Sequence, residues 1–389
     1  MPEGTGKLNI AIFGHKRIPS REGGIEVVVE KLATWMVEQG HQVTCYDRSG
    51  HHVSGAEFDT HEGKLYKGVK LKQVWTINRR GLAAMTSSVS SAFLAAVGSY
   101  DVVHIHAEGP AFMCWLPKLA GKRVIVTVHG LDHQRAKWGR FAQKYIMMGE
   151  RSAARYADEI IVLSRGVQDY FEKTYRRDTR FIPNGVERPM PVEAKEIKER
   201  WGLEKDNYVL FLGRLVPEKG IQYLIEAWKG IRTDKRLVVA GGSSDSESFM
   251  NGLREMADGN VIFTGFIQGR ILEELFSNAY VYCLPSDLEG MPLSLLEAMS
   301  YGNCCLVSDI SECTEVVESH GVVFRHGNAA ALRKALQSLL DAPELVKRYR
   351  GTAAEYICRK YSWDDMAEKT LELYLGKTGC AVEECGLMK

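Results

Sequence analysis

Short apolar runs alternate with helical patterns along almost the whole chain, and this alternation restricts the fold more than any other feature. Helical patterns occupy residues 25–39, 82–97 and 139–156 of the first half. Between them, runs of strand length read as continuous Val, Ile and Leu, as expected for parallel strands that are buried on both faces. These runs are LNIAIFG, HQVTCYD, DVVHIHA, RVIVTVH and DEIIVLS. This order predicts an α/β fold built on a parallel sheet.

The alternation pauses once, at FIPNGVERPMPVEAKE, which contains three prolines and no apolar period. We interpret this segment as the connection between two domains. The pattern restarts with YVLFLG, RLVVAG, NVIFTG, AYVYCLP and CCLVS. We therefore predict two domains, 1–185 and 186–360, then a helix over 361–376 and a short tail over 377–389. Ligands of such folds bind in the cleft between the domains, at the carboxyl ends of the strands.

Composition narrows the class of protein and of partner. With 45% hydrophobic and 25% charged residues, the 389-residue chain is an ordinary globular protein. Its 50 basic and 49 acidic residues give no reason to expect nucleic acid as a partner. We expect a cytoplasmic protein with reduced thiols, because no secretory signal or membrane-length apolar run is visible and most of the nine cysteines lie in elements that are expected to be buried. Cys380 and Cys385 lack the neighbours that a zinc site needs.

The stretch FLGRLVPEKG places two cations at the end of an expected strand. Gly213 closes the strand, Arg214 follows at once, and Lys219 precedes the next helix. Arginine donates two hydrogen bonds to phosphate oxygens and lysine adds a compact charge, so together they can neutralise a diphosphate without a metal. The alternative is a solvated turn that carries two ordinary surface cations.

The stretch EGMPLSLLEAMSYG places one acid before a helix and another inside it. Pro292 suits the first helical turn, whose free backbone N–H groups attract anions. Glu289 would then reach the hydroxyls of a sugar from the loop, and Glu297 would accept hydrogen bonds from a ribose diol. The apolar neighbours of Glu297 favour burial, and a buried carboxylate needs partners. The alternative is that Glu289 only complements the helix dipole while Glu297 is exposed.

Residues of the first half can complete such a cleft. His129 emerges from the carboxyl end of a strand, where it could donate to a sugar hydroxyl or a phosphate, although a lone histidine is also a common packing residue. Gly23 and Gly24 stand between a strand and a helix and would admit a ligand to the backbone, but they form no GxGxxG fingerprint. The basic residues near His129 would face a phosphorylated acceptor, an anionic membrane or simply solvent. They are Arg135, Lys137, Arg140 and Lys144.

The sequence contains no Asp-x-Asp, no His/Cys/Asp cluster at metal spacing, no GxSxG and no P-loop motif. We therefore expect no metal and no other cofactor.

Taken together, these stretches resemble the glycosyltransferases of family 4, which have the GT-B architecture of two facing Rossmann-like domains. The resemblance includes GG at 23–24, GRLVPEKG at 213–220, EGMPLSLLE at 289–297 and YSWDDMAEKTLELY at 361–374, and so covers nearly the whole chain. The stretches REGGIEVVVEKLA and HGLDHQRAKWG also resemble a bacterial subgroup that contains rhamnosyltransferases of polysaccharide assembly.

The resemblance implies a role for each position. Arg214 and Lys219 would hold the donor diphosphate, Glu297 the ribose and Glu289 the transferred sugar, which His129 would touch from the other domain. Gly23 and Gly24 would line the phosphate or acceptor side, and the final helix would cross back onto the first domain. The remaining donor-side positions are Gly213, Phe266 (beside the nucleobase), Gly290, and Met291 and Leu293 (through their amides). The family's Gly-x-Gly-Pro turn is replaced here by AGGSSDSE.

We therefore expect a retaining, metal-independent enzyme that moves a hexose or deoxyhexose from a nucleotide-diphosphate sugar to a carbohydrate or lipid-linked acceptor, in cell-surface polysaccharide synthesis. Peripheral contact with an anionic membrane is expected through the basic residues above. Two alternatives remain open: a nucleotide-sugar epimerase of the same two-domain plan, and a non-catalytic protein that binds nucleotide sugars.

Overall fold

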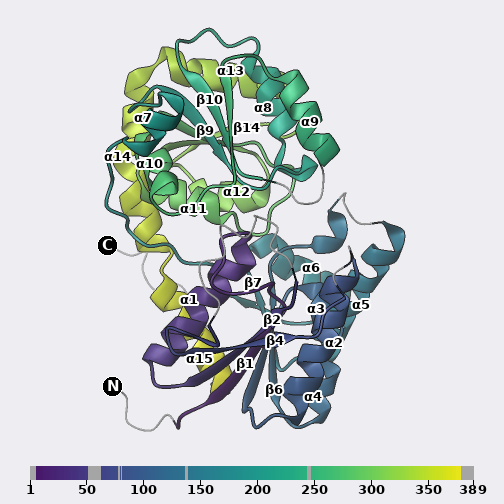
Figure 1. Cartoon of the computed structure of the whole chain (residues 1–389). Helices are drawn as coiled ribbons and strands as arrows, with labels where there is room; N and C mark the ends of the chain where they lie inside the picture. Colours follow the sequence, from purple (N-terminus) through teal and green to yellow (C-terminus); the bar gives the residue numbers. More distant parts are fainter. Residues whose placement is uncertain are drawn as a thin grey trace, which may run out of the picture.

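The computed structural model describes residues 6–50, 63–77, 79, 81–135, 139–242 and 247–377, which form two α/β units stacked on one another (Figure 1). Each unit is built on its own parallel sheet with helices on its faces, so the predicted fold class is confirmed. The helices are α1 (Gly24–Glu38), α2 (Leu82–Val97), α3 (Glu108–Ala111), α4 (Trp115–Leu119), α5 (Arg140–Tyr156), α6 (Arg165–Tyr175), α7 (Glu196–Trp201), α8 (Ile221–Trp228), α9 (Glu247–Met256), α10 (Arg270–Asn278), α11 (Leu293–Ser300), α12 (Ser311–Val317), α13 (Ala329–Asp341), α14 (Pro343–Lys360) and α15 (Trp363–Tyr374), with the 3-10 turns η2 (Asp132–Gln134) and η3 (Pro217–Lys219).

The first sheet has the strand order β3-β4-β2-β1-β5-β6-β7-β8. All neighbouring strands are parallel except β3 and β4, which form an antiparallel pair at one edge. One apolar cluster lies on each face of this sheet. The strands are β1 (Asn9–Phe13), β2 (Gln42–Arg48), β3 (Leu65–Tyr66), β4 (Val69–Val74), β5 (Val102–His106), β6 (Arg123–Val128), β7 (Glu159–Val162) and β8 (Arg180–Phe181).

The second sheet has the order β11-β10-β9-β12-β13-β14, is parallel throughout and is enclosed in a single large apolar cluster. Because the strands run in one direction, their carboxyl ends lie along one edge. The strands are β9 (Tyr208–Leu212), β10 (Arg236–Ala240), β11 (Val261–Gly265), β12 (Val281–Leu284), β13 (Cys304–Ser308) and β14 (Val322–Phe324).

All ten apolar runs singled out in the sequence contain a strand, and the strands that were not predicted are short or polar. β3 and β8 have two residues each and β14 has three. The sequence of β4, VKLKQV, has lysines on its exposed positions, so it does not read as a continuous apolar run. Only Val69 and Val74, at its two ends, are buried, as expected for a strand near the edge of a sheet.

The chain crosses between the two units twice, and the crossings lie side by side. The first follows β8, and the second leads from α14 into α15. A Cβ atom on Gly185 would lie 2.1 Å from the backbone nitrogen of Trp363, so only glycine permits this approach. The Val186 N–H donates to the Tyr361 carbonyl oxygen at 3.3 Å. The two crossing segments therefore support each other where the chain passes between the units.

Helix α15 packs on the first unit although it is the last helix in the described part of the chain. Figure 1 shows it in yellow beside α1, in the lower unit. Met366, Leu373 and Tyr374 enter the apolar cluster of the first sheet, and the Trp35 indole N–H donates to Asp364 at 3.0 Å. The carboxyl-terminal part of the described chain thus contributes to the core of the first unit.

Among the described residues, no helix combines the length and the apolar content that crossing a membrane would need.

Candidate active site

The two units touch backbone to backbone at the carboxyl ends of β6 and β12. A Cβ atom on Gly290 would lie 1.6 Å from the His129 carbonyl oxygen, and one on Gly130 would lie 2.9 Å from the Gly290 Cα. Gly130 also has a φ of +134°, which side-chain-bearing residues rarely adopt. Glycines on both sides therefore let the units close tightly, and they bring His129 next to Glu289.

Glu289 is a buried carboxylate with two partners from its own unit. Its Oε1 accepts a hydrogen bond from the Lys219 ammonium at 2.6 Å and one from the Ser286 hydroxyl, also at 2.6 Å. Lys219 ends the turn η3, which follows β9, and the positive φ of Gly220 lets this turn pack against the Pro285 carbonyl. The structure therefore brings Lys219 and Glu289 together, as one ion pair.

Arg214 is the cation of this group whose side chain has no partner in the described part of the chain. It lies directly after β9 and is half-buried, and its side chain forms no hydrogen bond or ion pair with any residue that the structure describes. A Cβ atom on the neighbouring Gly213 would lie 4.0 Å from the Lys219 Cε, so Lys219 reaches back to the end of the same strand. Arg214 is thus a charge that is available to an anion near Lys219.

Glu297 meets an unexpected partner from the other unit. Its Oε1 lies 3.2 Å from Arg21 Nη1, and the Glu297 side chain keeps 30% of its surface exposed. Burial raises the pKa of Glu297, while the charge and hydrogen bond of Arg21 oppose that rise. The sequence reasoning missed Arg21, whose position two residues before Gly23 was the only available signal.

The first residues of α1 and α11 approach each other where the two units meet. Leu293 begins α11, and Pro292 is the residue before it rather than part of the predicted first turn. A Cβ atom on Gly24, the first residue of α1, would lie 3.4 Å from the Leu293 side chain. Since helix N-termini carry partial positive charge, the two ends together favour an anion in the cleft.

The other predicted donor-side residues border this group. The Met291 sulfur accepts a hydrogen bond from the backbone N–H of Asn184, in the connection between the units, at 3.1 Å. Gly23 caps α1 and lies beside the buried Glu26. Phe266 follows β11 and approaches Gly242, which places it at the β10–β11 side of the strand ends. Half of the AGGSSDSE departure, residues 243–246, lies outside the described residues.

His129 is held by a second histidine. Its Nε2 lies 2.9 Å from the Nδ1 of His106, and the two rings stack with centroids 5.2 Å apart. Burial lowers the pKa of His129 to about 4, so its ring is neutral near pH 7. With Nε2 engaged, Nδ1 is the ring atom that remains for a substrate. His106 was not predicted, because nothing in the sequence pairs the two positions.

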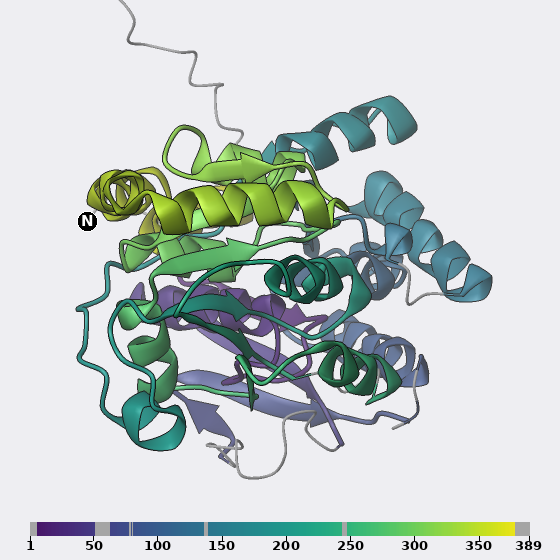
Figure 2. The ribbon, with the colours of Figure 1, turned by 90° about the horizontal axis from the view of Figure 1, so that it is seen from above.

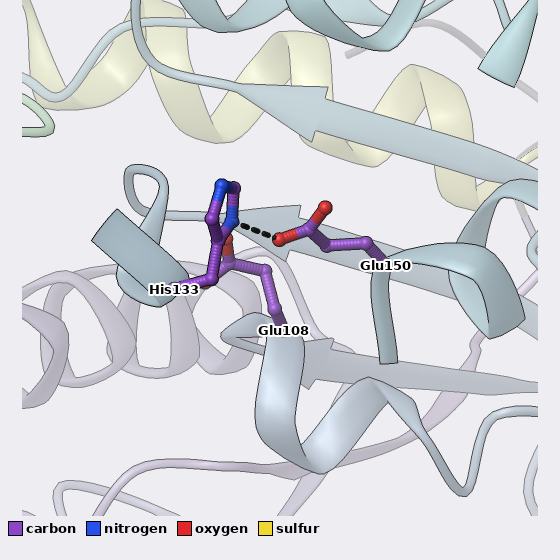
Figure 3. Close-up of side chains that lie close together, drawn as sticks. All are labelled: Glu108, His133 and Glu150. Carbon is purple, nitrogen blue, oxygen red and sulfur yellow. Dashed lines mark hydrogen bonds and ion pairs between the residues drawn. The ribbon is translucent and has the colours of Figure 1, made fainter. Parts of the chain in front are cut away.

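A cluster of Glu108, His133 and Glu150 lies in the first unit (Figure 3). It is the one group of three or more potential metal ligands among the described residues, and its candidate atoms lie within 4.8 Å of one another. Each atom already has a partner. His133 Nδ1 bonds Glu150 Oε1 at 2.6 Å, Tyr170 and Tyr175 donate to Glu150 Oε2, and Glu108 accepts the Asp132 N–H. The cluster is therefore complete as a hydrogen-bond network.

The predicted basic patch does not form as one surface. Arg135 keeps only 16% of its side-chain surface and pairs with Asp132 and Glu218 in the cleft. Arg140 and Lys144 are exposed on α5, and Lys137 lies outside the described residues. Grouping Arg135 with the exposed cations was wrong, because Arg135 is largely buried between Asp132 of its own turn and Glu218, which is distant in sequence.

Two family models divide the chain along the same lines as the two sheets. Residues 22–188 match Glycosyltransferase Family 4, and residues 193–373 match Glycosyl transferases group 1. The chain is a glycosyltransferase. Its family 4 character and its GT-B architecture agree with the resemblance noted in the sequence.

Individual relatives of this glycosyltransferase are distant but match it over most of their length. It is 26% identical to the phosphatidyl-myo-inositol mannosyltransferase of Mycobacterium leprae, over 90% of this chain and 92% of that one. Its fold matches a sucrose-phosphate synthase from Thermosynechococcus elongatus with a TM-score of 0.80, at 22% identity over 95% and 99% of the chains. It also matches HepE of Anabaena in complex with UDP and glucose, with a TM-score of 0.78, at 15% identity over 95% and 100% of the chains.

Proposed function

We propose that this glycosyltransferase moves a hexose or deoxyhexose from a nucleotide-diphosphate sugar to a carbohydrate or lipid-linked acceptor and retains the anomeric configuration. The observation that carries the proposal is an unpaired cation, Arg214, beside the Lys219–Glu289 pair at the closed cleft. A nucleotide-diphosphate sugar needs positive charge near its diphosphate and hydrogen-bond acceptors near its hydroxyl groups. Arg214 and Lys219 would supply the first, and Glu289 and Glu297 the second. The UDP complex of the Anabaena relative is consistent with such a donor.

The residues suggest how the transfer proceeds. The bond between the sugar C1 and the diphosphate oxygen breaks, and its electron pair goes to that oxygen. Arg214, Lys219 and the start of α11 stabilise the added charge. The acceptor hydroxyl oxygen forms the new bond to C1 on the same face, and its proton passes to the departing phosphate oxygen. Glu289 is engaged by Lys219 and Ser286, so we assign it to positioning the sugar hydroxyls rather than to forming a covalent intermediate.

We further propose that the reaction needs no metal ion. In this scheme two side-chain cations supply the charge that a divalent ion would otherwise provide. Transfer should therefore proceed at an unchanged rate after dialysis against a chelator. A loss of activity that magnesium or manganese restores would contradict this part of the proposal.

Donor binding is the first test. Calorimetric titration with UDP, GDP, dTDP, ADP and CDP should give saturable binding of at least one of them to the purified protein. Arg214→Ala should weaken that binding about tenfold or more, since a hydrogen bond to a charged group contributes about 1.5–3 kcal/mol. Absence of binding for all five nucleotides would overturn the proposed function.

A nucleotide-sugar epimerase shares this architecture and is separated from a transferase by its products. With a nucleotide sugar and no acceptor, the proposed enzyme gives at most slow hydrolysis, whereas an epimerase converts the sugar. Formation of the epimer without acceptor, followed by NMR, would replace the proposal with that alternative.

A lipid-linked acceptor would be reached from the membrane surface, and the outer face of the first unit suits that contact. Helix α2 contains no charged residue and exposes Val89, Phe93 and Val97. Phe141 on α5 is 83% exposed, and the only acid of α5, Glu150, is buried. Helix α5 lies at the margin of the molecule, to the side of the second unit (Figures 1 and 2). We propose that this face contacts anionic lipid, in support of polysaccharide assembly at the cell surface.

The contact can be measured by co-sedimentation with phosphatidylglycerol vesicles. Replacing the exposed cations of α5 by serine should release the protein, because each cation contributes about 1 kcal/mol near an anionic surface. Equal release by the matched change in the second unit would exclude a specific face. The α5 set is Arg140, Lys144, Arg151 and Arg155, and the control set is Lys229, Lys334, Arg348 and Arg359.

A further inference from the structure

Arg135 belongs to the first unit, and its side chain reaches η3, the turn of the second unit that carries Lys219. It follows the turn η2, and its Nε donates to Asp132 Oδ1 at 2.6 Å. Its Nη1 lies 3.7 Å from Oε1 of Glu218, the residue before Lys219 in η3. Thus the guanidinium is fixed at one edge by its own unit, and its other edge faces the turn that carries Lys219.

Glu218 forms only a weak contact with the Arg135 guanidinium. Its side chain is 4% exposed, and neither of its carboxylate oxygens has a hydrogen bond among the described residues. The 3.7 Å contact with Arg135 is an ion pair beyond hydrogen-bonding distance. Because phosphate oxygens accept short, charge-assisted bonds from arginine, a phosphate can compete for the same edge of the guanidinium.

The Glu108–His133–Glu150 cluster accounts for the position of Arg135 (Figure 3). Both Glu108 oxygens accept the backbone N–H of Asp132, at 3.1 and 3.3 Å. His133 is bonded to Glu150, which Tyr170 and Tyr175 hold from the other side. The turn η2 is therefore fixed to the core of the first unit at two points, and Arg135 follows it with much of its side-chain freedom already lost.

The positive charge of the second unit alone does not balance the negative charge of a diphosphate. Lys219 is largely compensated by Glu289 at 2.6 Å, so Arg214 is the one cation of the pair that is free to meet a phosphate. A diphosphate carries at least two negative charges and gains another when the bond to the sugar breaks. A further cation at this turn would stabilise that charge, and one supplied by the first unit acts only when the cleft is closed.

We propose that Arg135 is a third cation of the diphosphate site and binds the terminal phosphate of the nucleotide when the two units close. This inference rests on the proposed function, since it assigns a further residue to the same donor. Glu218 holds Arg135 in the empty protein and is replaced by phosphate oxygens in the complex. Glu108 and Glu150 act through η2 and are positioning residues.

The test compares nucleotides that differ only in the terminal phosphate. Titrations use the diphosphate that binds the wild type best and its monophosphate, with Arg135→Gln, Arg135→Lys and Glu218→Gln as variants. Arg135→Gln should weaken diphosphate binding about tenfold to a hundredfold and change monophosphate binding less than about twofold. Arg135→Lys should fall between, because it keeps the charge and loses the fork. Glu218→Gln should leave diphosphate binding unchanged or stronger.

An interdomain strut would behave differently. If Arg135 and Glu218 only held the units together, both substitutions would weaken both nucleotides alike, and that result would overturn the inference. Unchanged diphosphate affinity in Arg135→Gln would overturn it as well, while wild-type binding would still support the proposed function. Failure of the wild type to bind any diphosphate would instead remove the proposed function itself. Thermal melting of each variant reports the fold, and Arg135→Lys serves if Arg135→Gln does not fold.

Discussion

Glu297 forms an ion pair with Arg21 of the other unit. In the proposed complex, the ribose of the donor would have to take the place of Arg21. The contact is 3.2 Å long and partly exposed, so it is weak enough to be exchanged. A diol that donates two hydrogen bonds to a carboxylate is a stronger partner than one screened ion pair. In the proposed site, Arg21 is the partner of the Glu297 carboxylate until the ribose replaces it.

Glu297→Gln should therefore weaken nucleoside diphosphate binding about tenfold, because the ribose loses a charged acceptor. Calorimetry measures the change. Glu204→Gln is the matched control, since Glu204 is an exposed carboxylate in a surface pair with Lys198. A Glu297→Gln protein that binds as tightly as its control would remove the ribose assignment.

Substitutions of Arg214 and of Lys219 should differ in their effect on the stability of the protein. Arg214 has no described partner, so Arg214→Ala should leave the melting temperature nearly unchanged while donor binding falls. Lys219→Ala leaves Glu289 buried without its ion-pair partner, a change that costs about 3–5 kcal/mol in buried pairs. Melting curves and titrations of the two variants test this. Equal stability of both would mean that Glu289 does not depend on Lys219.

At the scale of residues, the sequence predicts candidate site residues that lie within one motif. It does not predict contacts between residues of two distant segments. Arg214, Lys219, Glu289 and Glu297 follow from the spacing of residues around strand ends and a helix start. Contacts between the units are found only when the chain is folded, since Arg21 pairs with Glu297 and Arg135 pairs with Glu218, the residue before Lys219. No periodicity or spacing carries that information.

At the scale of elements, α15 is tied to the first sheet by a buried histidine. His104 of β5 bonds Tyr374 of α15 at 2.6 Å and Thr127 of β6 at 2.7 Å. Burial lowers the pKa of His104 to about 3. The alternation of apolar runs predicted β5, β6 and α15 as elements, but it could not show that polar side chains inside those runs join them.

This histidine makes stability depend on acidity. The folded-state pKa is lowered, so its contribution is complete above the unfolded value of about 6.5 and is lost as the pH falls towards 3. Between pH 7 and pH 5 the loss should be about 2 kcal/mol for this one group. Urea unfolding of the wild type and of His104→Gln should show a smaller loss in the variant. Identical losses would mean that His104 does not stay neutral in the fold.

At the scale of the whole molecule, closure depends on glycines where the two units meet. The sequence predicted two α/β units and a connection between them, because the strand pattern repeats on both sides of one proline-rich pause. It could not predict how tightly they close. Gly130 and Gly290 carry no visible signal until the backbones are seen within van der Waals contact.

Gly290→Ala should hold the cleft open, since its Cβ atom would collide with the His129 carbonyl oxygen. We expect transfer to fall at least about tenfold, because roughly an ångström of misplacement already costs large factors in rate. Small-angle scattering should show a larger radius of gyration, with the melting temperature little changed. Gly259→Ala is the control, because a Cβ atom there meets nothing within 4 Å. Full activity of Gly290→Ala would show that this contact is not needed for transfer.

The arrangement of the donor can be seen directly in a crystal structure of the protein with its preferred nucleotide-diphosphate sugar. We expect the diphosphate against Arg214, Lys219 and the first turn of α11, and the ribose on Glu297 with Arg21 displaced. A nucleotide bound outside this cleft, or an intact Arg21–Glu297 pair beside a bound donor, would contradict the assignment of this site.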